Sequence, residues 1–158
     1  MLLPVTLDLA HSVGVMSFIA RYGNPAVDYD GAQVRARFRH GATVVAVNGR
    51  IDSSNVERVC AYATRFILAD KPFVLDLSGV SHFSPQAFRL LSGVDDQCLI
   101  AGVEWAMVAG DAVSWRLRAR SNEDMFPVVA SVAEAEREFD DAILHRRRML
   151  LPLLSKTA

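Results

Sequence analysis

Cysteine is scarce in this chain of 158 residues, and neither sign of charge is in excess. The two cysteines, Cys60 and Cys98, have no partner cysteine or histidine at metal-ligand spacing, so neither a zinc site nor a disulfide framework is expected. Both fall at apolar positions of predicted helices, where a free cysteine behaves as a small buried hydrophobe and indicates a reducing compartment. The net charge of -1 provides no broad cationic field, which argues against a nucleic-acid partner.

Motifs of the common enzyme classes are also missing. The nine glycines are scattered and form neither of the usual phosphate-binding loops, and no Gly-x-Ser-x-Gly elbow occurs. The histidines suggest no ligand set or catalytic pair, because they lie far apart in the chain, at His11, His40, His82 and His145. The sequence therefore predicts a protein that is not an enzyme and that uses no metal or cofactor.

The first 20 residues are apolar but lack the features of a targeting or anchoring segment. A signal peptide begins with basic residues, and none occurs here. A membrane span of about 20 residues tolerates Pro4, Asp8 and His11 poorly. We therefore expect a cytoplasmic protein whose residues 1–30 pack on the domain or pair two copies into a homodimer. A true start at Met16 is the alternative interpretation.

Composition divides the chain into three parts. Residues 22–33 are rich in Gly, Pro and Asp and are predicted to be a linker, which places an N-terminal extension and linker at 1–33. The predicted domain covers 34–140, and residues 141–158 form a tail that is basic and then apolar, HRRRMLLPLLSKTA. Three arginines adhere only weakly to an anionic membrane, so a frayed or partner-covered C-terminus is preferred to firm membrane association.

The predicted domain alternates between strand and helix patterns. Apolar residues and arginines alternate strictly over Val34–Arg39, which indicates a half-buried strand that turns back into a second strand at Thr43–Asn48. Ser54 and Glu57 have the spacing of a capping box ahead of an amphipathic helix. The later predicted elements are a strand at Phe73–Leu77, a strand at Val103–Ala109, a helix from Gly110 with Arg116 outward, a strand at Phe126–Ala130, and a helix that opens with a capping box at Ser131–Glu134.

A second helix start is predicted after the strand that ends at Leu77. Ser84 fits an N-cap with Pro85 at the first helical position, and the inner face of the helix follows at Ala87, Leu90, Leu91, Val94 and Cys98. The order of elements is strand, strand, helix, strand, helix, strand, helix, strand, helix. It predicts an α/β fold with a mixed, mostly parallel sheet, an opening antiparallel hairpin and about four helices.

Three stretches of the predicted domain form a familiar combination, and they are VVAVNGRID, FVLDLSGVSHFSPQAFRLL and FPVVASVAEAEREF. Together they resemble the STAS domain, the fold of bacterial anti-sigma factor antagonists, and the likeness runs from Val34 to Phe139. The resemblance implies a STAS-like fold and a signalling role in transcription regulation by protein–protein interaction. Family members bind an anti-sigma factor, often a serine kinase, and free the sigma factor that it held.

The resemblance also implies a partner-binding loop. The family carries a Ser or Thr phosphoacceptor at the start of the helix after the central strand, and aligning that loop places Gln86 at the acceptor position. Ser78 matches the family's Asp-Leu-Ser motif, and Asp52 matches an acidic residue in the neighbouring turn. The expected loop residues are Asp52, Ser78, Ser84, Gln86 and Phe88.

The amide at the acceptor position changes the expected chemistry. Gln86 has no hydroxyl and cannot form the usual phosphoester, so our preferred hypothesis is a module locked in its unmodified state. Ser84 is an alternative phosphorylation site, although a capping hydroxyl bound to a backbone donor is the preferred interpretation. Asp52 either caps its own helix or steers a basic partner.

Two other function classes stay open at this point. The first is a STAS module that senses a small molecule or nucleotide, because a helix N-terminus holds an anion even without a phosphate loop. The second is a self-assembling scaffold whose copies pair through the apolar N-terminal segment.

Overall fold

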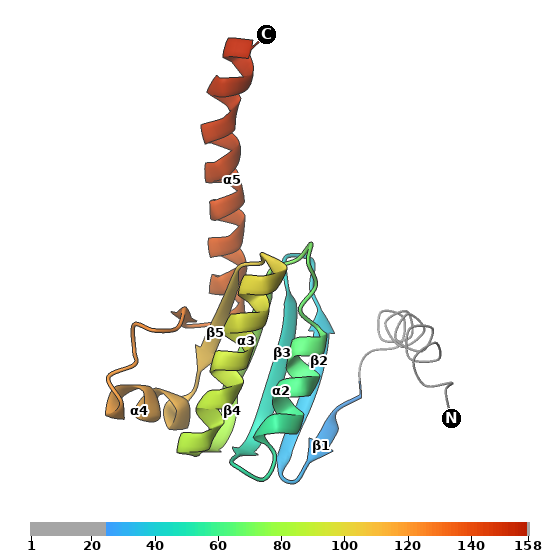
Figure 1. Ribbon diagram of the computed structural model, residues 1–158, viewed down its shortest axis with the longest axis vertical. Helices are drawn as coiled ribbons and strands as arrows, with labels where there is room; N and C mark the ends of the chain where they lie inside the picture. Colours follow the sequence, from blue (N-terminus) through green and yellow to red (C-terminus); the bar gives the residue numbers. More distant parts are fainter. Residues whose placement is uncertain (1–24, 158) are drawn as a thin grey trace.

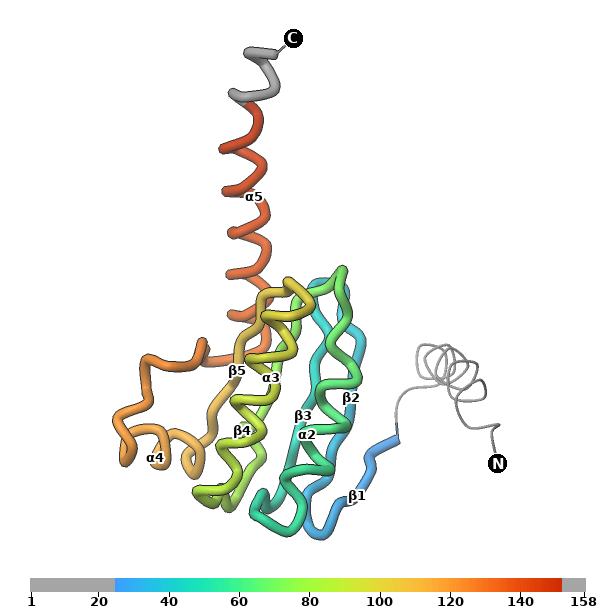
Figure 2. Tube along the Cα trace, in the orientation of Figure 1, coloured from blue at the N-terminus to red at the C-terminus, as the bar shows by residue number. Residues whose placement is uncertain are grey.

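The computed structural model describes residues 25–157, with side chains described as far as Leu151. Strands from these residues form a six-stranded sheet in the order β1-β2-β3-β4-β5-β6 (Figures 1 and 2). The first two pairings are antiparallel and the other three are parallel. The predicted fold class is confirmed. Most of the predicted pairing segment 1–30 lies outside the described residues.

The antiparallel part contains β1 (Val27–Tyr29), β2 (Ala32–Phe38) and β3 (Thr43–Ile51). β2 alternates buried and exposed residues, as the alternation of apolar residues and arginines predicts. The strand β1 corrects the prediction of a linker over 22–33. Asp30 and Gly31 have positive φ angles of 49° and 97°, so they form the tight turn that joins β1 to β2 rather than a loose connection.

The parallel part contains β4 (Phe73–Phe83), β5 (Trp105–Ala109) and β6 (Val128–Val129). β4 continues well beyond its predicted end at Leu77, because β3 pairs with it as far as Phe83. The register between β3 and β4 shifts twice, and near one shift a Cβ on Gly79 would lie 1.7 Å from the side-chain oxygen of Asn48. Residues 78–83 are polar enough for the sequence to predict a loop, and pairing with β3 makes them part of a strand instead.

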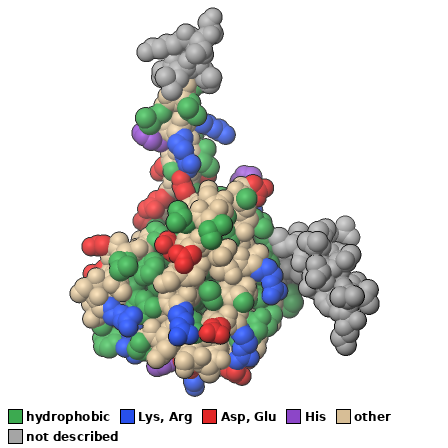
Figure 3. Space-filling view, viewed as in Figure 1, with side chains coloured by type: hydrophobic (Ala, Val, Ile, Leu, Met, Phe, Trp, Pro, Cys, Tyr) green, Lys and Arg blue, Asp and Glu red, His purple; other side chains and the backbone are tan. Residues whose placement is uncertain are grey.

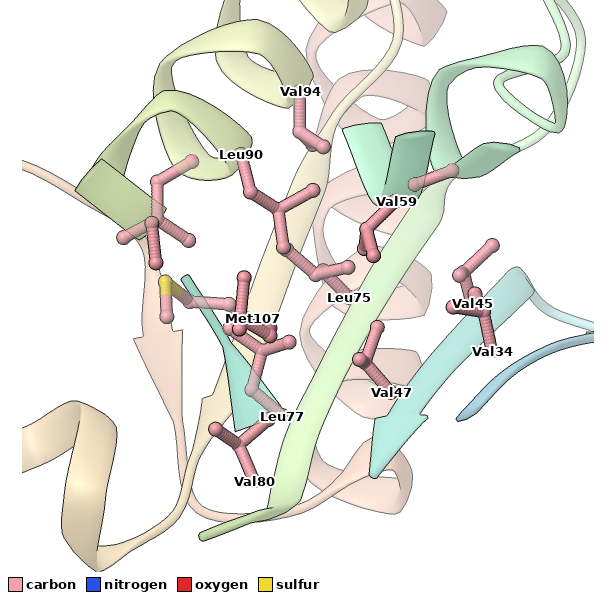
Figure 4. Close-up of a cluster of buried hydrophobic side chains, with 14 of the residues drawn as sticks. Val34, Val45, Val47, Val59, Leu75, Leu77, Val80, Leu90, Val94 and Met107 are labelled. Atoms are coloured by element: carbon pink, nitrogen blue, oxygen red, sulfur yellow. The ribbon is translucent and has the colours of Figure 1, made fainter. Parts of the chain in front are cut away.

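Helices cover the two faces of the sheet unequally (Figure 1). α2 (Val56–Arg65) and α3 (Phe88–Ala101) lie side by side on one face, and α4 (Asp111–Ala119) adds Val113 and Leu117 to the same apolar cluster. The first turns of α5 (Val132–Thr157) cover part of the other face. Figure 4 shows side chains from β2, β3, β4 and β5 meeting Val59 of α2 and Leu90 and Val94 of α3.

The two predicted capping boxes have different outcomes. At α2 the prediction is wrong, because the helix begins after Asn55 and the N–H and hydroxyl of Ser54 both donate to Asp52 Oδ1. At α5 it is confirmed, because Ser131 Oγ accepts from the Glu134 N–H at 3.1 Å. The Glu134 carboxylate accepts from the Ala130 N–H at 2.6 Å, one residue before the Ser131 N–H that the usual box would use.

Residues 141–157 extend the last helix of the domain, although the sequence predicts a separate tail there. α5 runs as one helix to Thr157, and its later turns project away from the sheet (Figures 1 and 2). Arg146 forms an ion pair with Glu104 close to where the helix leaves the body. None of the helices in the described part of the chain has the length and hydropathy needed to cross a membrane.

Candidate functional site

Two strand-to-helix junctions meet at the carboxyl end of β3 and β4. Ile51, the last residue of β3, pairs with Phe83, the last residue of β4. The Ser84 N–H donates to the Ile51 carbonyl at 3.0 Å, which ties the second junction to the first. Asp52 and Gln86 therefore lie at the same end of the sheet, the end where α/β proteins commonly place their functional residues.

Asp52 is partly exposed and is held in one position. Its Oδ1 accepts from the Ser54 N–H at 2.9 Å, and its Oδ2 accepts from Arg50 Nη2 at 3.1 Å. These bonds, those from Ser54 first, lower the pKa of Asp52 from 3.8 to about 2. The carboxylate is therefore ionised at neutral pH. It accepts from the N–H of Ser54, which lies before α2, and α2 itself has no side-chain cap, so the prediction that Asp52 caps its helix is wrong.

Asn55 supports the first junction from the interior, a role that sequence reasoning missed. Only 1% of it is exposed. Its Nδ2 donates to the Tyr29 carbonyl at 2.9 Å and to the Arg50 carbonyl at 2.8 Å, while its Oδ1 accepts from the Asp52 N–H at 3.0 Å. A buried amide with these partners fixes β1 to the end of β3. No local pattern signals this, because Tyr29 is 26 positions away.

Ser84 precedes η1 (Pro85–Ala87), a 3₁₀ turn that leads into α3. The prediction of Pro85 at the first helical position is confirmed. The predicted cap by the Ser84 hydroxyl is wrong, because Ser84 is 7% exposed and its Oγ has no hydrogen-bond partner among the described residues. The backbone closes the turn instead, with the Ala87 N–H donating to the Ser84 carbonyl at 3.0 Å. A kinase would have to open this junction to reach the hydroxyl.

Gln86 is exposed on the same turn. Together with Pro85 it borders a shallow hollow along the start of α3, which is also lined by Phe88, Arg89, Ser92, Gly93, Asp96 and Arg120. The hollow places apolar carbon beside charges of both signs. The residue at the predicted acceptor position is therefore accessible to a partner.

Phe88 is buried rather than displayed. It is 8% exposed, and its ring meets the Phe83 ring edge-on with the centroids 5.5 Å apart. The guanidinium carbon of Arg120 lies 4.7 Å from the Phe88 ring centroid. Phe88 therefore anchors α3 to the end of β4 and supports the junction from within.

Arg116 binds the same strand end, which corrects the prediction that it lies outward. Its Nε donates to the Phe83 carbonyl at 2.8 Å, and the residue is half-buried. The bond satisfies a carbonyl at the end of β4 and joins α4 to the junction. Its neighbours Arg118 and Arg120 are exposed, and all three arginines look alike in sequence.

Ser78 does not belong to the junction. It lies within β4, and at about 3.3 Å per residue the strand carries it well away from Ser84. Its N–H and its hydroxyl both donate to Asp76 Oδ1, at 3.0 Å and 2.7 Å. The structure thus removes Ser78 from the predicted partner-binding loop, while its expected local hydrogen bonding is confirmed.

Titratable groups elsewhere offer little reactive chemistry. Within residues 25–157, no group of His, Cys, Asp and Glu side chains is arranged to hold a metal ion. Cys60 and Cys98 are free, and burial raises the pKa of both thiols, that of Cys98 to about 12 with a contribution from Asp95. Both thiols are therefore protonated at neutral pH and are poor nucleophiles. The feature that solvent reaches at the carboxyl end of the sheet is the turn that carries Pro85 and Gln86.

A relative matches almost the whole chain. Osmosensory protein A of Mycobacterium tuberculosis (strain ATCC 25618 / H37Rv) is 45% identical over 158 residues, which cover 98% of this chain and 100% of that protein.

Two solved structures have the same fold. An anti-sigma factor antagonist from Mycobacterium paratuberculosis has a TM-score of 0.61 at 18% identity, over 72% of this chain and 97% of that chain. An anti-sigma-factor antagonist (STAS) domain protein from Planctomyces limnophilus has a TM-score of 0.58 at 16% identity, over 68% of this chain and 97% of that chain. A family model described as the STAS domain matches residues 33–135. The chain belongs to the STAS domain family.

Proposed function

We propose that this chain is a non-enzymatic signalling protein that binds an anti-sigma factor or another regulatory protein. The contact surface is the end of the sheet around Asp52, Pro85 and Gln86. The observation that supports this most directly is the exposure of Gln86, the residue that the resemblance aligns with the family's phosphoacceptor. The likeness in fold to two anti-sigma factor antagonists is a second support.

The carboxamide of Gln86 keeps this surface in the unmodified state. A phosphate at the same position would add about -1.5 to -2 charges at the end of the sheet that also carries the ionised Asp52. It would repel an acidic partner surface and would have to lose its water against a neutral one. Because the amide accepts no phosphate, covalent switching at this position is lost. Binding then depends on the amounts of the two proteins or on other parts of the chain.

Charge at position 86 is the variable to test. We expect Gln86→Glu to weaken binding of a kinase-type anti-sigma factor at least tenfold, measured by titration calorimetry, because a carboxylate imitates part of the phosphate charge. Gln97→Glu is the matched control, since Gln97 is an exposed glutamine later on α3. Equal affinities of the two variants would contradict the proposed surface.

Restoring the hydroxyl tests the lost switch separately. Incubated with the partner kinase and ATP, the Gln86→Ser variant should incorporate phosphate, whereas the natural chain should not. Label on Ser84 of the natural chain would show that the switch has moved rather than disappeared.

The name of the relative suggests the signal. A protein called osmosensory matches nearly the whole chain, and we propose that this chain also acts in the response to osmotic stress. Deleting its gene should alter the transcriptional response to high salt, measured by RNA sequencing. An unchanged response would contradict this part of the proposal.

A further inference from the structure

The outer half of α5 exposes apolar side chains that no other described element covers. Ala135 and Phe139 in its first turns are buried against the sheet. Further along the helix the apolar side chains are 39% to 63% exposed, at Ile143, Leu144, Met149, Leu150 and Leu151. Figure 3 shows hydrophobic side chains along the projecting part of the molecule. A helix that is apolar on several sides is usually buried by a partner.

Leu144 and Leu151 lie on a side of α5 that has no role in the domain. They are seven residues apart, which is close to two helical turns, so they lie one above the other. Each residue turns the helix by about 100°, which places Leu144 roughly 140° around the axis from the buried Phe139. Leu144 and Leu151 therefore do not continue the line of buried residues, Ala135 and Phe139, that packs against the sheet. We call this side of α5 the outer seam.

Charges flank the outer seam in a regular way. Asp140 and Arg147 are seven residues apart and lie on one flank of Leu144. Asp141 and Arg148 have the same spacing and lie on the other flank. All four side chains are exposed. Figure 3 shows acidic side chains near the base of the projecting helix and basic ones further out. If two such helices lie side by side in opposite directions, the acidic half of each faces the basic half of the other.

We propose that a second copy of this chain covers the outer seam, with the two α5 helices antiparallel and a two-fold axis near Leu144. In an antiparallel pair each flank of one helix faces the same flank of the other. Asp140 then lies beside Arg147 of the second copy, and Asp141 beside Arg148 of the second copy, and two-fold symmetry repeats both pairs. A parallel pair would instead bring like charges to the same level, which is unfavourable.

The arrangement also suits the shape of the molecule. α5 projects away from the sheet, so antiparallel helices place the two domains at opposite ends of the helical pair (Figure 1). The seam is remote from Asp52 and Gln86, which leaves both copies of the proposed partner surface open. The dimer therefore does not depend on the proposed function, and either proposal can fail alone.

The first test is the mass of the full-length protein in solution. We expect a dimer by light scattering, and we expect Leu144→Asp to raise the dimer dissociation constant at least tenfold, because it buries a charge in the seam. Leu99→Asp is the matched control, since Leu99 is 81% exposed on α3 and should leave the dimer intact. A natural chain that stays monomeric, or a dimer that Leu144→Asp leaves unchanged, would overturn the proposal.

The second test uses paired charge reversals. The variant Asp140→Arg with Asp141→Arg and the variant Arg147→Asp with Arg148→Asp should each be monomeric alone, because the flanks then repel. Mixed in equal amounts they should form a heterodimer. Two variants that do not associate on mixing would contradict the antiparallel pairing. Binding of the natural monomer to vesicles that contain anionic lipid, in place of dimerisation, would assign the arginines to a membrane surface and overturn it too.

Cross-linking tests the position of the axis. A disulfide between the two copies of Leu144→Cys should form readily on oxidation, since the Cα atoms near a two-fold axis approach within disulfide range. Leu151→Cys should not cross-link to itself, because antiparallel pairing sets residue 151 opposite residue 137. Cross-linking of Leu151→Cys with itself would indicate parallel helices.

Discussion

The two ends of this molecule are built in opposite ways. At the carboxyl end of the sheet, segments distant in sequence are tied together by hydrogen bonds, such as Ser84 N–H to the Ile51 carbonyl at 3.0 Å. At the other end, α5 leaves the body with the ion pair of Arg146 and Glu104 and then exposes apolar side chains. The first end is a preorganised surface, and the second resembles one half of an interface. The comparison teaches that the polar groups at the first end find their partners within the domain, whereas the apolar groups at the second end find no cover among the described residues.

The preorganised end depends on residues that support its turns from within. Asn55 fixes the turn that carries Asp52, and Arg116 holds the end of the strand that leads to Gln86. Phe88 packs beneath the same turn against Phe83. Rigid support of this kind lowers the entropy lost on binding, and this raises the affinity without any added contact.

Truncating a buried leucine of the domain and an exposed leucine of α5 should give the largest difference in the free energy of unfolding. Leu90 is fully buried on α3, and Leu90→Ala should lower the free energy of unfolding by about 2–5 kcal/mol through lost contacts and a cavity. Leu144 is 48% exposed, and Leu144→Ala should change monomer stability by less than about 0.5 kcal/mol while weakening the dimer. Urea unfolding at low protein concentration measures the free energy of unfolding of both variants as monomers. A large loss of monomer stability in Leu144→Ala would show that α5 is already packed.

Removing the Arg116 side chain should have an intermediate effect. Arg116→Ala leaves the Phe83 carbonyl without its charged donor, which should cost about 1–3 kcal/mol of stability and loosen the turn at Gln86. Partner affinity should fall as well, although Arg116 is not part of the proposed contact surface. Arg118→Ala, at an exposed position of the same helix, is the control. If Arg116→Ala and Arg118→Ala behave alike, the bond to β4 does not position the site.

Acidification should have the smallest effect. The pKa of Asp52 is lowered to about 2, so the carboxylate stays charged as the pH falls from about 8 to 5, and partner binding should not change through this group. A lowered pKa stabilises the fold above the unfolded value of 3.8, and this contribution is lost as the pH falls towards 2. An NMR titration of the side-chain carboxyl carbon checks the value. A midpoint near 4 would mean that the bonds to Ser54 and Arg50 are absent in solution.

Much of the fold follows from local patterns in the sequence. The alternation in β2, the buried stripe of α3 and the proline that begins η1 were all predictable, because each depends on periodicity or on backbone restraints of single residues. The strand β1 and the second half of β4 were not. A three-residue strand and a polar strand are stabilised by their neighbours in the sheet, and a local pattern does not contain that information.

The candidate site divides in the same way. The position of Gln86 on an exposed turn after the central strand followed from family motifs and from the Ser-Pro pair. The roles of Asn55 and Arg116, the burial of Ser84 and Phe88, and the removal of Ser78 from the loop needed coordinates. Each depends on a contact between segments that are far apart in the chain.

By itself, the sequence determined the class of the fold, its family and the absence of a hydroxyl at residue 86, because these reside in residue identity and short-range periodicity. Only the tertiary structure decided which polar groups are buried, which strands are completed by pairing, and that the last helix stands clear of the sheet with its leucines exposed. The physical reason is that burial and hydrogen bonding are properties of neighbours in space, and neighbours in space are settled only when the whole chain has folded.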